Sequence, residues 1–182
     1  MKKLISALLF SALLLASCAS APVDEVTDLS TGPSTDGETS VSVPEEFAGF
    51  ALTVGEARLM TGEVTDVTAL LGTPNDKLEA PSCIHEGNDT VYYYDGLEVT
   101  TSPSDAGDYI LTIQITSEDV KTEEGIGFGS SLDEAKAVYG EYDAALSSPD
   151  FGRYVFLRAG TSLTLLTDGD NIVTSVTYTA EQ

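Results

Sequence analysis

Two stretches of the chain carry the same helix-like pattern, and this repeat constrains the fold more than any other feature. Residues 62–72 read GEVTDVTALLG and residues 129–140 read GSSLDEAKAVYG. In both stretches apolar residues recur at positions i, i+3, i+6 and i+7, which predicts one apolar face of a short amphipathic helix. These residues are Val64, Val67, Leu70 and Leu71 in the first stretch and Leu132, Ala135, Val138 and Tyr139 in the second. Each stretch ends in a glycine, as helices often do.

A loop and then three strand-like runs follow each predicted helix, and the first loop reads TPNDKLEAPSCIHEGND, residues 73–89. The runs cover residues 90–94, 97–101 and 109–116 after the first helix, and 154–158, 162–167 and 172–178 after the second. Apolar and polar residues alternate in 109–116, and Asp95-Gly96 is a hairpin turn signal. We therefore predict an α+β fold with two tandem units of one short helix plus three antiparallel strands, packed as one domain. Since one such unit alone would be marginally stable, the two are expected to share a core or to extend one sheet.

The N-terminus has the pattern of a secretory signal. Two lysines, Lys2 and Lys3, precede an apolar run over residues 4–14, and Leu-Ala-Ser-Cys18 follows. A basic start, a short apolar stretch and small residues before a cleavage site are typical of a signal peptide. The last four residues resemble the bacterial lipoprotein signal. That resemblance implies that residues 1–17 are removed and that Cys18 receives the lipid.

The rest of the chain divides by composition. Residues 18–46 are rich in Ser, Thr, Pro and acidic residues, and we expect them to form a disordered tether after the lipidated cysteine. Residues 47–121 would form the first helix–sheet unit, and residues 122–182 the second. The predicted location is the outer face of the plasma membrane, with the lipid on Cys18 as the anchor.

The chain is strongly acidic. Its formal net charge is −22 at pH 7, and loss of Lys2 and Lys3 with the signal peptide would make it −24. Such a charge repels phosphate backbones, so we expect no nucleic acid partner. The charge favours solubility first, and a cationic partner or loosely bound Ca²⁺ second.

Cysteine and histidine are scarce. If Cys18 carries lipid, Cys83 has no partner within the chain, so it is buried, lies in a reducing compartment or pairs with another molecule. Cys83 and the single histidine, His85, supply two ligands, whereas a metal site needs three or four. They are therefore only weak metal candidates. No catalytic constellation and no cofactor-binding fingerprint is present, so we predict neither an enzyme nor a cofactor.

Aromatic residues mark two of the predicted strands. In the run Tyr92-Tyr93-Tyr94, the first and third side chains should share one face of the sheet. Tyr154 and Phe156 have the same spacing in the second unit. These five residues are the candidate interaction surface, because aromatic side chains are enriched in protein interfaces. The alternative is that they pack in the core.

The segment from Gly125 to Gly140 and the sequence Leu71-Gly72-Thr73-Pro74 resemble the helix signature of the beta-lactamase-inhibitor-protein-like fold and of the small outer-membrane-assembly lipoproteins. The two-unit layout, the Ser82-Cys83 loop and the tyrosine-rich strand also resemble uncharacterised lipoproteins of Gram-positive anaerobes. In the named families the concave face of the sheet binds proteins. The tether, the repeat and the lack of a catalytic constellation predict a non-catalytic, lipid-anchored protein-interaction module. The alternative is a small-ligand or metal-binding lipoprotein that uses the Cys83–His85 loop.

Overall fold

The computed structural model describes residues 49–181, so the predicted signal peptide, Cys18 and the tether to residue 46 lie outside the described residues. The described part is mostly β-structure and contains nine strands, two α-helices and a short 3-10 helix, η2. In chain order these are β1 (Ala51–Val54), β2 (Ala57–Met60), α1 (Val67–Leu71), β3 (Asp76–Pro81), β4 (Asn88–Tyr94), β5 (Leu97–Ser102), β6 (Tyr109–Ile115), α2 (Leu132–Tyr139), η2 (Pro149–Phe151), β7 (Arg153–Arg158), β8 (Thr161–Thr167) and β9 (Val173–Ala180).

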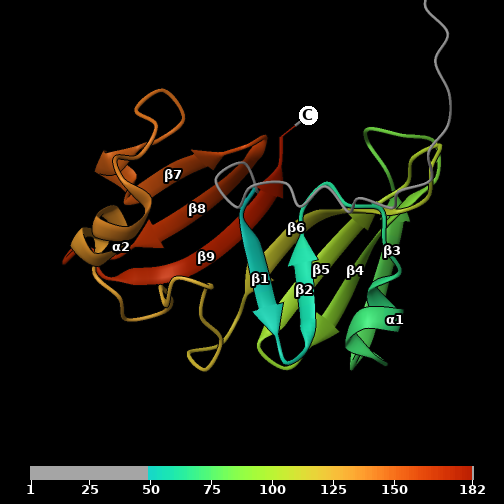
Figure 1. Cartoon of the computed structure of the whole chain (residues 1–182). Helices are drawn as coiled ribbons and strands as arrows, with labels where there is room; N and C mark the ends of the chain where they lie inside the picture. Colours follow the sequence, from blue (N-terminus) through green and yellow to red (C-terminus); the bar gives the residue numbers. More distant parts are fainter. Residues whose placement is uncertain (1–48, 182) are drawn as a thin grey trace, which may run out of the picture. The chain divides into compact units, whose positions relative to one another are not determined.

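The strands form two antiparallel sheets. Seven strands lie in the order β3-β4-β5-β6-β9-β8-β7, and β1 pairs with β2 as a separate hairpin (Figure 1). The pairing of β6 with β9 joins strands from the two halves of the chain, with Ile113 opposite Tyr178 and Ile115 opposite Val176. The two halves therefore share one continuous sheet.

The predicted fold class is wrong. The described chain does not consist of two units that each contain one helix and three strands, because β1 and β2 precede the first helix and β3 directly follows it. The sequence TPNDKLEAP, which we expected to be a loop, contains β3. The six strand-like runs do correspond to strands, and with β3 they form one sheet, which is one of the two ways of joining the halves that the sequence left open.

The two helices are shorter than their repeats suggested. Helix α1 has five residues, because Asp66 caps it: its carboxylate accepts hydrogen bonds from the amides of Thr68 and Ala69. Val64 lies before the cap and forms an isolated bridge with Tyr109 instead. Helix α2 has eight residues and begins with a capping box in which Ser131 and Glu134 bond to each other's backbone amides.

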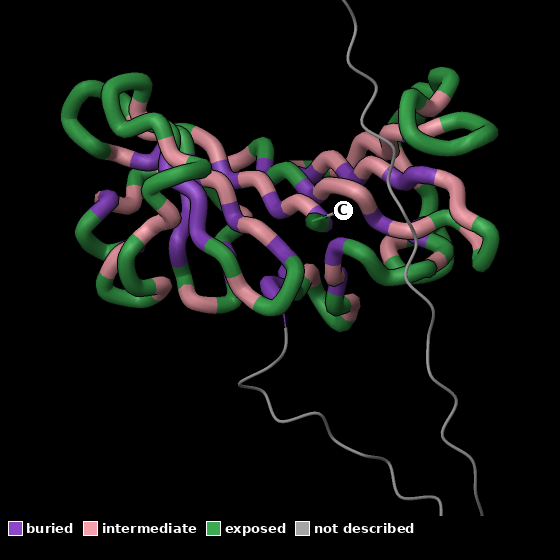
Figure 2. Tube along the Cα trace, turned by 90° about the horizontal axis from the view of Figure 1, so that it is seen from above, coloured by how far each residue is buried: buried purple, intermediate pink, exposed green. Residues whose placement is uncertain are grey.

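One face of the seven-stranded sheet carries the core. A single row of facing residues crosses six strands on this face, namely Tyr92, Val99, Ile113, Tyr178, Leu163 and Phe156. The β1–β2 hairpin covers the row with Leu52 and Leu59, while α1 adds Val67 and α2 adds Leu132. Figure 2 shows buried and intermediate positions alternating along much of the sheet, while many exposed positions lie in the loops. This alternation is the pattern of a sheet with one covered face.

A cluster of interactions joins α2, β7 and the segment before α2. The Arg158 guanidinium lies 2.9 Å from a Glu124 carboxylate oxygen and 4.4 Å from the centre of the Phe50 ring. Tyr139 of α2 packs edge-on against Phe50. An arginine that is both ion-paired and stacked on an aromatic ring fixes the elements around it.

Within the described residues, no helix has the length and apolar character needed to cross a membrane.

Candidate functional site

The five aromatic residues of the predicted interaction surface do not lie together. Tyr154 and Phe156 are buried in the core, 5% and 1% exposed, so they offer no surface to a partner. Tyr92 and Tyr94 lie on the covered face of β4 and are partly buried against the core, while Tyr93 points to the opposite face. Of the five residues, Tyr92 is the one that also lines the hollows described next.

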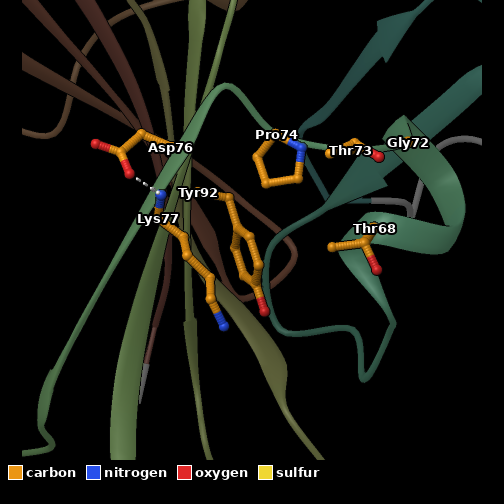
Figure 3. Close-up of a pocket in the computed structure, with 7 residues that line it drawn as sticks. All are labelled: Thr68, Gly72, Thr73, Pro74, Asp76, Lys77 and Tyr92. Carbon is orange, nitrogen blue, oxygen red and sulfur yellow. Dashed lines mark hydrogen bonds between the residues drawn. The ribbon is translucent and has the colours of Figure 1, made fainter.

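Tyr92 lies at the floor of an open hollow of about 710 Å³ between α1 and β3. Figure 3 shows its ring and the Lys77 side chain pointing the same way from neighbouring strands, with Pro74 next to the ring and Thr68 of α1 across from it. The remaining lining residues are Gly72, Thr73 and Asp76. This hollow exists because β3 extends the sheet past the elements that cover it: every residue of β3 is exposed.

A second open hollow, of about 540 Å³, lies at the start of α1 and also includes Tyr92. Its other lining residues are Val64, Thr65, Asp66, Val67, Thr101 and Asp108. Because the two hollows share the Tyr92 ring and contain opposite ends of α1, we treat them as one site and call it the α1 groove. Tyr94 supports it from below, since its hydroxyl donates to the Gly72 carbonyl at 3.2 Å and ties the end of the helix to β4.

The polar groups of the α1 groove are partly engaged. Lys77 forms an ion pair with Glu79 at 2.7 Å, and this hydrogen bond raises the pKa of the ammonium. The Thr68 hydroxyl and the Ala69 and Thr68 amides bond to Asp66 and lower the pKa of its carboxyl. The Tyr92 hydroxyl, by contrast, makes no hydrogen bond to any described residue, so it is available to a bound molecule.

The groove offers recognition chemistry. It combines an aromatic ring, threonine hydroxyls, one ammonium and several carboxylates. No histidine or cysteine lines it, so the hydroxyls there have no neighbouring imidazole to act as a base. An arrangement of this kind can hold a peptide through ring contacts and hydrogen bonds.

The Cys83–His85 loop lies elsewhere, between β3 and β4. Cys83 is free and exposed, which removes burial from the three fates considered for it. His85 packs edge-on against Tyr109 and lines a separate hollow with Glu86, Ser104, Asp105 and Ala106. Within residues 49–181, no three His, Cys, Asp or Glu side chains cluster closely enough to hold a metal ion. Metal or ligand binding through Cys83 and His85 therefore stays a prediction without a built site behind it.

Of the candidate interaction residues named from the sequence, only Tyr92 lines the α1 groove. Lys77 was missed because it stands in a segment that we expected to be a loop, and Asp108 because it is brought to α1 only by the pairing of distant segments. The Gly72-Thr73-Pro74 signal marked the end of the helix, and it was the best available pointer to this end of the groove.

Comparison with known proteins adds little to this geometry. No family profile matches the chain, and no curated protein matches it. A distant structural neighbour is a DUF4309 family protein (YjgB) from Bacillus subtilis, with a TM-score of 0.39 and 18% sequence identity over 63% of this chain and 76% of that one. These comparisons indicate no catalytic family.

Proposed function

We propose that this protein is a lipid-anchored, extracytoplasmic module that binds another protein in the α1 groove and catalyses no reaction. The observation that carries the proposal is the position of Tyr92, whose half-buried ring and unbonded hydroxyl form the floor shared by both hollows. A ring fixed by its neighbours loses little conformational freedom on binding, which makes it an effective anchor for a partner.

The exposed strand β3 suits the groove to an extended peptide segment. Lys77 and Glu79 stand on the same side of the sheet as Tyr92 and lie at its edge. A segment lying between α1 and β3 would contact the ring at its centre and this ion pair at its rim. The rim charges would set orientation, since exposed ion pairs contribute little affinity.

The binding test compares two variants with the same chemical change. Thr73→Arg places a long side chain in the groove, whereas Thr116→Arg adds the same charge at an exposed position after β6. Each full-length, lipidated protein is crosslinked in its native membranes, recovered and examined by mass spectrometry. We expect one dominant partner with the wild type and Thr116→Arg, and recovery at least about tenfold lower with Thr73→Arg. Equal recovery with both variants would exclude the groove, and no partner for a folded, anchored protein would contradict protein binding itself.

The anchor has a separate test. The Leu-Ala-Ser-Cys18 sequence supports lipidation, so a clickable fatty acid fed to the producing cells should label the wild type. Cys18→Ser should lose the label and leave the membrane fraction, while Cys83→Ser should keep both. Equal labelling of Cys18→Ser would contradict the anchor without affecting the groove.

A further inference from the structure

A second surface presents an aromatic side chain to solvent at the other edge of the sheet. Phe151 ends helix η2, just before β7, and it is 87% exposed, the highest value among the large apolar residues that the structure describes. Strands β7 and β3 are the two edges of the seven-stranded sheet, so this surface and the α1 groove occupy opposite edges. Single exposed apolar residues are common. The case for Phe151 as a binding residue therefore rests on the ordered loop that carries it.

The loop that carries Phe151 is fixed by its own hydrogen bonds. The Asp143 carboxylate accepts hydrogen bonds from the amides of Ala145 and Leu146, each at 2.9 Å. The Ser147 hydroxyl accepts one from the Val155 amide, and the backbone of Ser148 pairs with that of Arg153. A loop already ordered in this way loses little further entropy when a partner binds.

Gly152 anchors the base of the loop against β8. Its φ is +65°, in the left-handed region, and a Cβ added there would lie 2.5 Å from the Thr167 carbonyl oxygen. No other residue fits at that distance without moving the backbone. The chain therefore turns tightly onto β8 immediately after Phe151.

Two further exposed apolar residues lie near Arg153, two positions after Phe151. Leu146 and Leu166 are both exposed and both neighbour Arg153: the guanidinium donates to the Leu146 carbonyl, and Leu166 faces Arg153 in the β7–β8 ladder. The arginine is thus engaged with the loop backbone.

Negative charge lies beside Phe151. A hollow of about 440 Å³ separates η2 from the turn between β8 and β9, and Phe151, Asp150 and Asp168 are among its lining residues. None of the described residues that line it is a lysine or arginine. An apolar tip with carboxylates around it complements a basic surface, and the overall charge of −22 strengthens that preference.

We propose that residues 143–153 form a docking loop for a protein whose surface has an apolar pocket bordered by lysine or arginine side chains. Phe151 fills the pocket, and Asp150 and Asp168 pair with the basic border. A lipid surface is the less favourable occupant, because anionic headgroups repel these carboxylates.

The test uses the full chain and a random peptide library displayed on phage. The library is first depleted on Phe151→Ala protein and then selected on the wild type. We expect peptides with lysine or arginine around apolar residues, whose affinity falls at least about tenfold with Phe151→Ala, drops with Asp150→Lys and weakens as salt increases. Ile84→Ala, another exposed apolar residue in a loop, serves as the matched control and should leave the affinity unchanged.

Three results would overturn the proposal. One is a selection that yields no peptide after depletion, and another is a set of peptides that bind Phe151→Ala as well as the wild type. The third is Phe151-dependent binding to phosphatidylcholine or phosphatidylglycerol vesicles, which would assign the loop to the membrane. Thr73→Arg is included to keep the two sites apart: it should abolish binding in the α1 groove and leave these peptides bound.

Discussion

At the scale of single residues, the partly buried Tyr139 and the buried Tyr178 differ in what their hydroxyl groups contact. The Tyr139 hydroxyl lies 2.6 Å from the Thr122 hydroxyl and 3.2 Å from a Glu124 carboxylate oxygen. The Tyr178 hydroxyl, in a residue that is 1% exposed, has no hydrogen-bond partner among the described residues. A buried polar group without a partner destabilises the folded state by about 1–3 kcal/mol. The same chemical change should therefore have opposite effects at the two positions.

Tyr178→Phe should increase the free energy of unfolding by about 1 kcal/mol, because it removes an unpaired hydroxyl and leaves the ring in place. Tyr139→Phe should decrease it by a similar amount, because Thr122 and Glu124 lose their shared partner. Urea denaturation followed by circular dichroism measures both values. If Tyr178→Phe is as destabilising as Tyr139→Phe, the Tyr178 hydroxyl is bonded after all.

The same two tyrosines predict sensitivity to alkali. Burial raises the pKa of Tyr139 and of Tyr178 above the ordinary value of 10.0. In the folded state both stay protonated at a pH where the unfolded chain has lost those protons. Their contribution to stability is thus complete below about pH 10 and is lost as pH rises through the higher folded values. Unfolding midpoints measured from pH 8 upward should decline above pH 10, less steeply in Tyr178→Phe than in the wild type. If stability declines with the same slope in Tyr178→Phe and in the wild type, the raised pKa of Tyr178 is not a cause of the decline.

At the scale of elements, the sequence predicted strands well where one face is buried and poorly where neither is. The run 109–116 alternates because Ile113 and Ile115 pack in the core while Gln114 between them is exposed. Strand β3 has no such signal: it lies at the sheet edge, all six residues are exposed, and Lys77, Glu79 and Pro81 are residues that strands usually avoid. Hairpin β1–β2 was missed although Gly55 separates two short apolar runs, because each strand has only four residues.

Strand β3 is an open edge that resists pairing with another chain. The Ser82 amide bonds to the Gly87 carbonyl, so the alternation of an antiparallel ladder turns the backbone of Lys77, Glu79 and Pro81 outward. The Lys77 amide already bonds to the Asp76 carboxylate at 2.8 Å, and Pro81 has no N–H. Glu79 is left as the outward donor of this strand, which is too little to template a ladder.

Restoring the missing backbone N–H donors should allow the edge strand β3 to pair with another copy of the chain. We expect the double variant Asp76→Ala, Pro81→Thr to self-associate, with an apparent mass that rises with concentration in sedimentation experiments, whereas the wild type should show no association through this edge. Adding Glu79→Pro removes an outward donor and should reverse the effect. If the double variant associates no more than the wild type, edge protection does not depend on these groups.

The capping box of α2 makes the free energy of unfolding depend on pH in the acid range. The Ser131 amide and hydroxyl bond to the Glu134 carboxylate and lower its pKa below the ordinary value of 4.5. A lowered folded pKa gives stability that is present above pH 4.5 and is lost as pH falls through the folded value. Ser131→Ala should lower the free energy of unfolding by about 1 kcal/mol at pH 7. Glu134→Gln should flatten the acid side of the stability profile, and an unchanged profile would contradict the role of this carboxylate.

At the scale of the whole molecule, the sequence predicted two repeats but not how they join. Periodicity shows which residues share a face, and it placed Tyr154 with Phe156 correctly. It does not show which face is covered, so both were candidates for a surface and both are in the core. The pairing of β6 with β9 has no signal in the local sequence, because it joins residues more than sixty positions apart, such as Thr112 and Thr179. The α1 groove depends in turn on where that single sheet ends.

The most direct test of this architecture is native-state hydrogen exchange of the full chain at increasing urea concentration. If one sheet spans both halves, the slowest amides of β5, β6, β8 and β9 should open with the same free energy and the same dependence on urea, as one cooperative unit. If β7, β8 and β9 instead exchange through an opening of their own while β4, β5 and β6 stay protected, the halves are separate units. That result would contradict the single seven-stranded sheet on which both proposed binding surfaces rest.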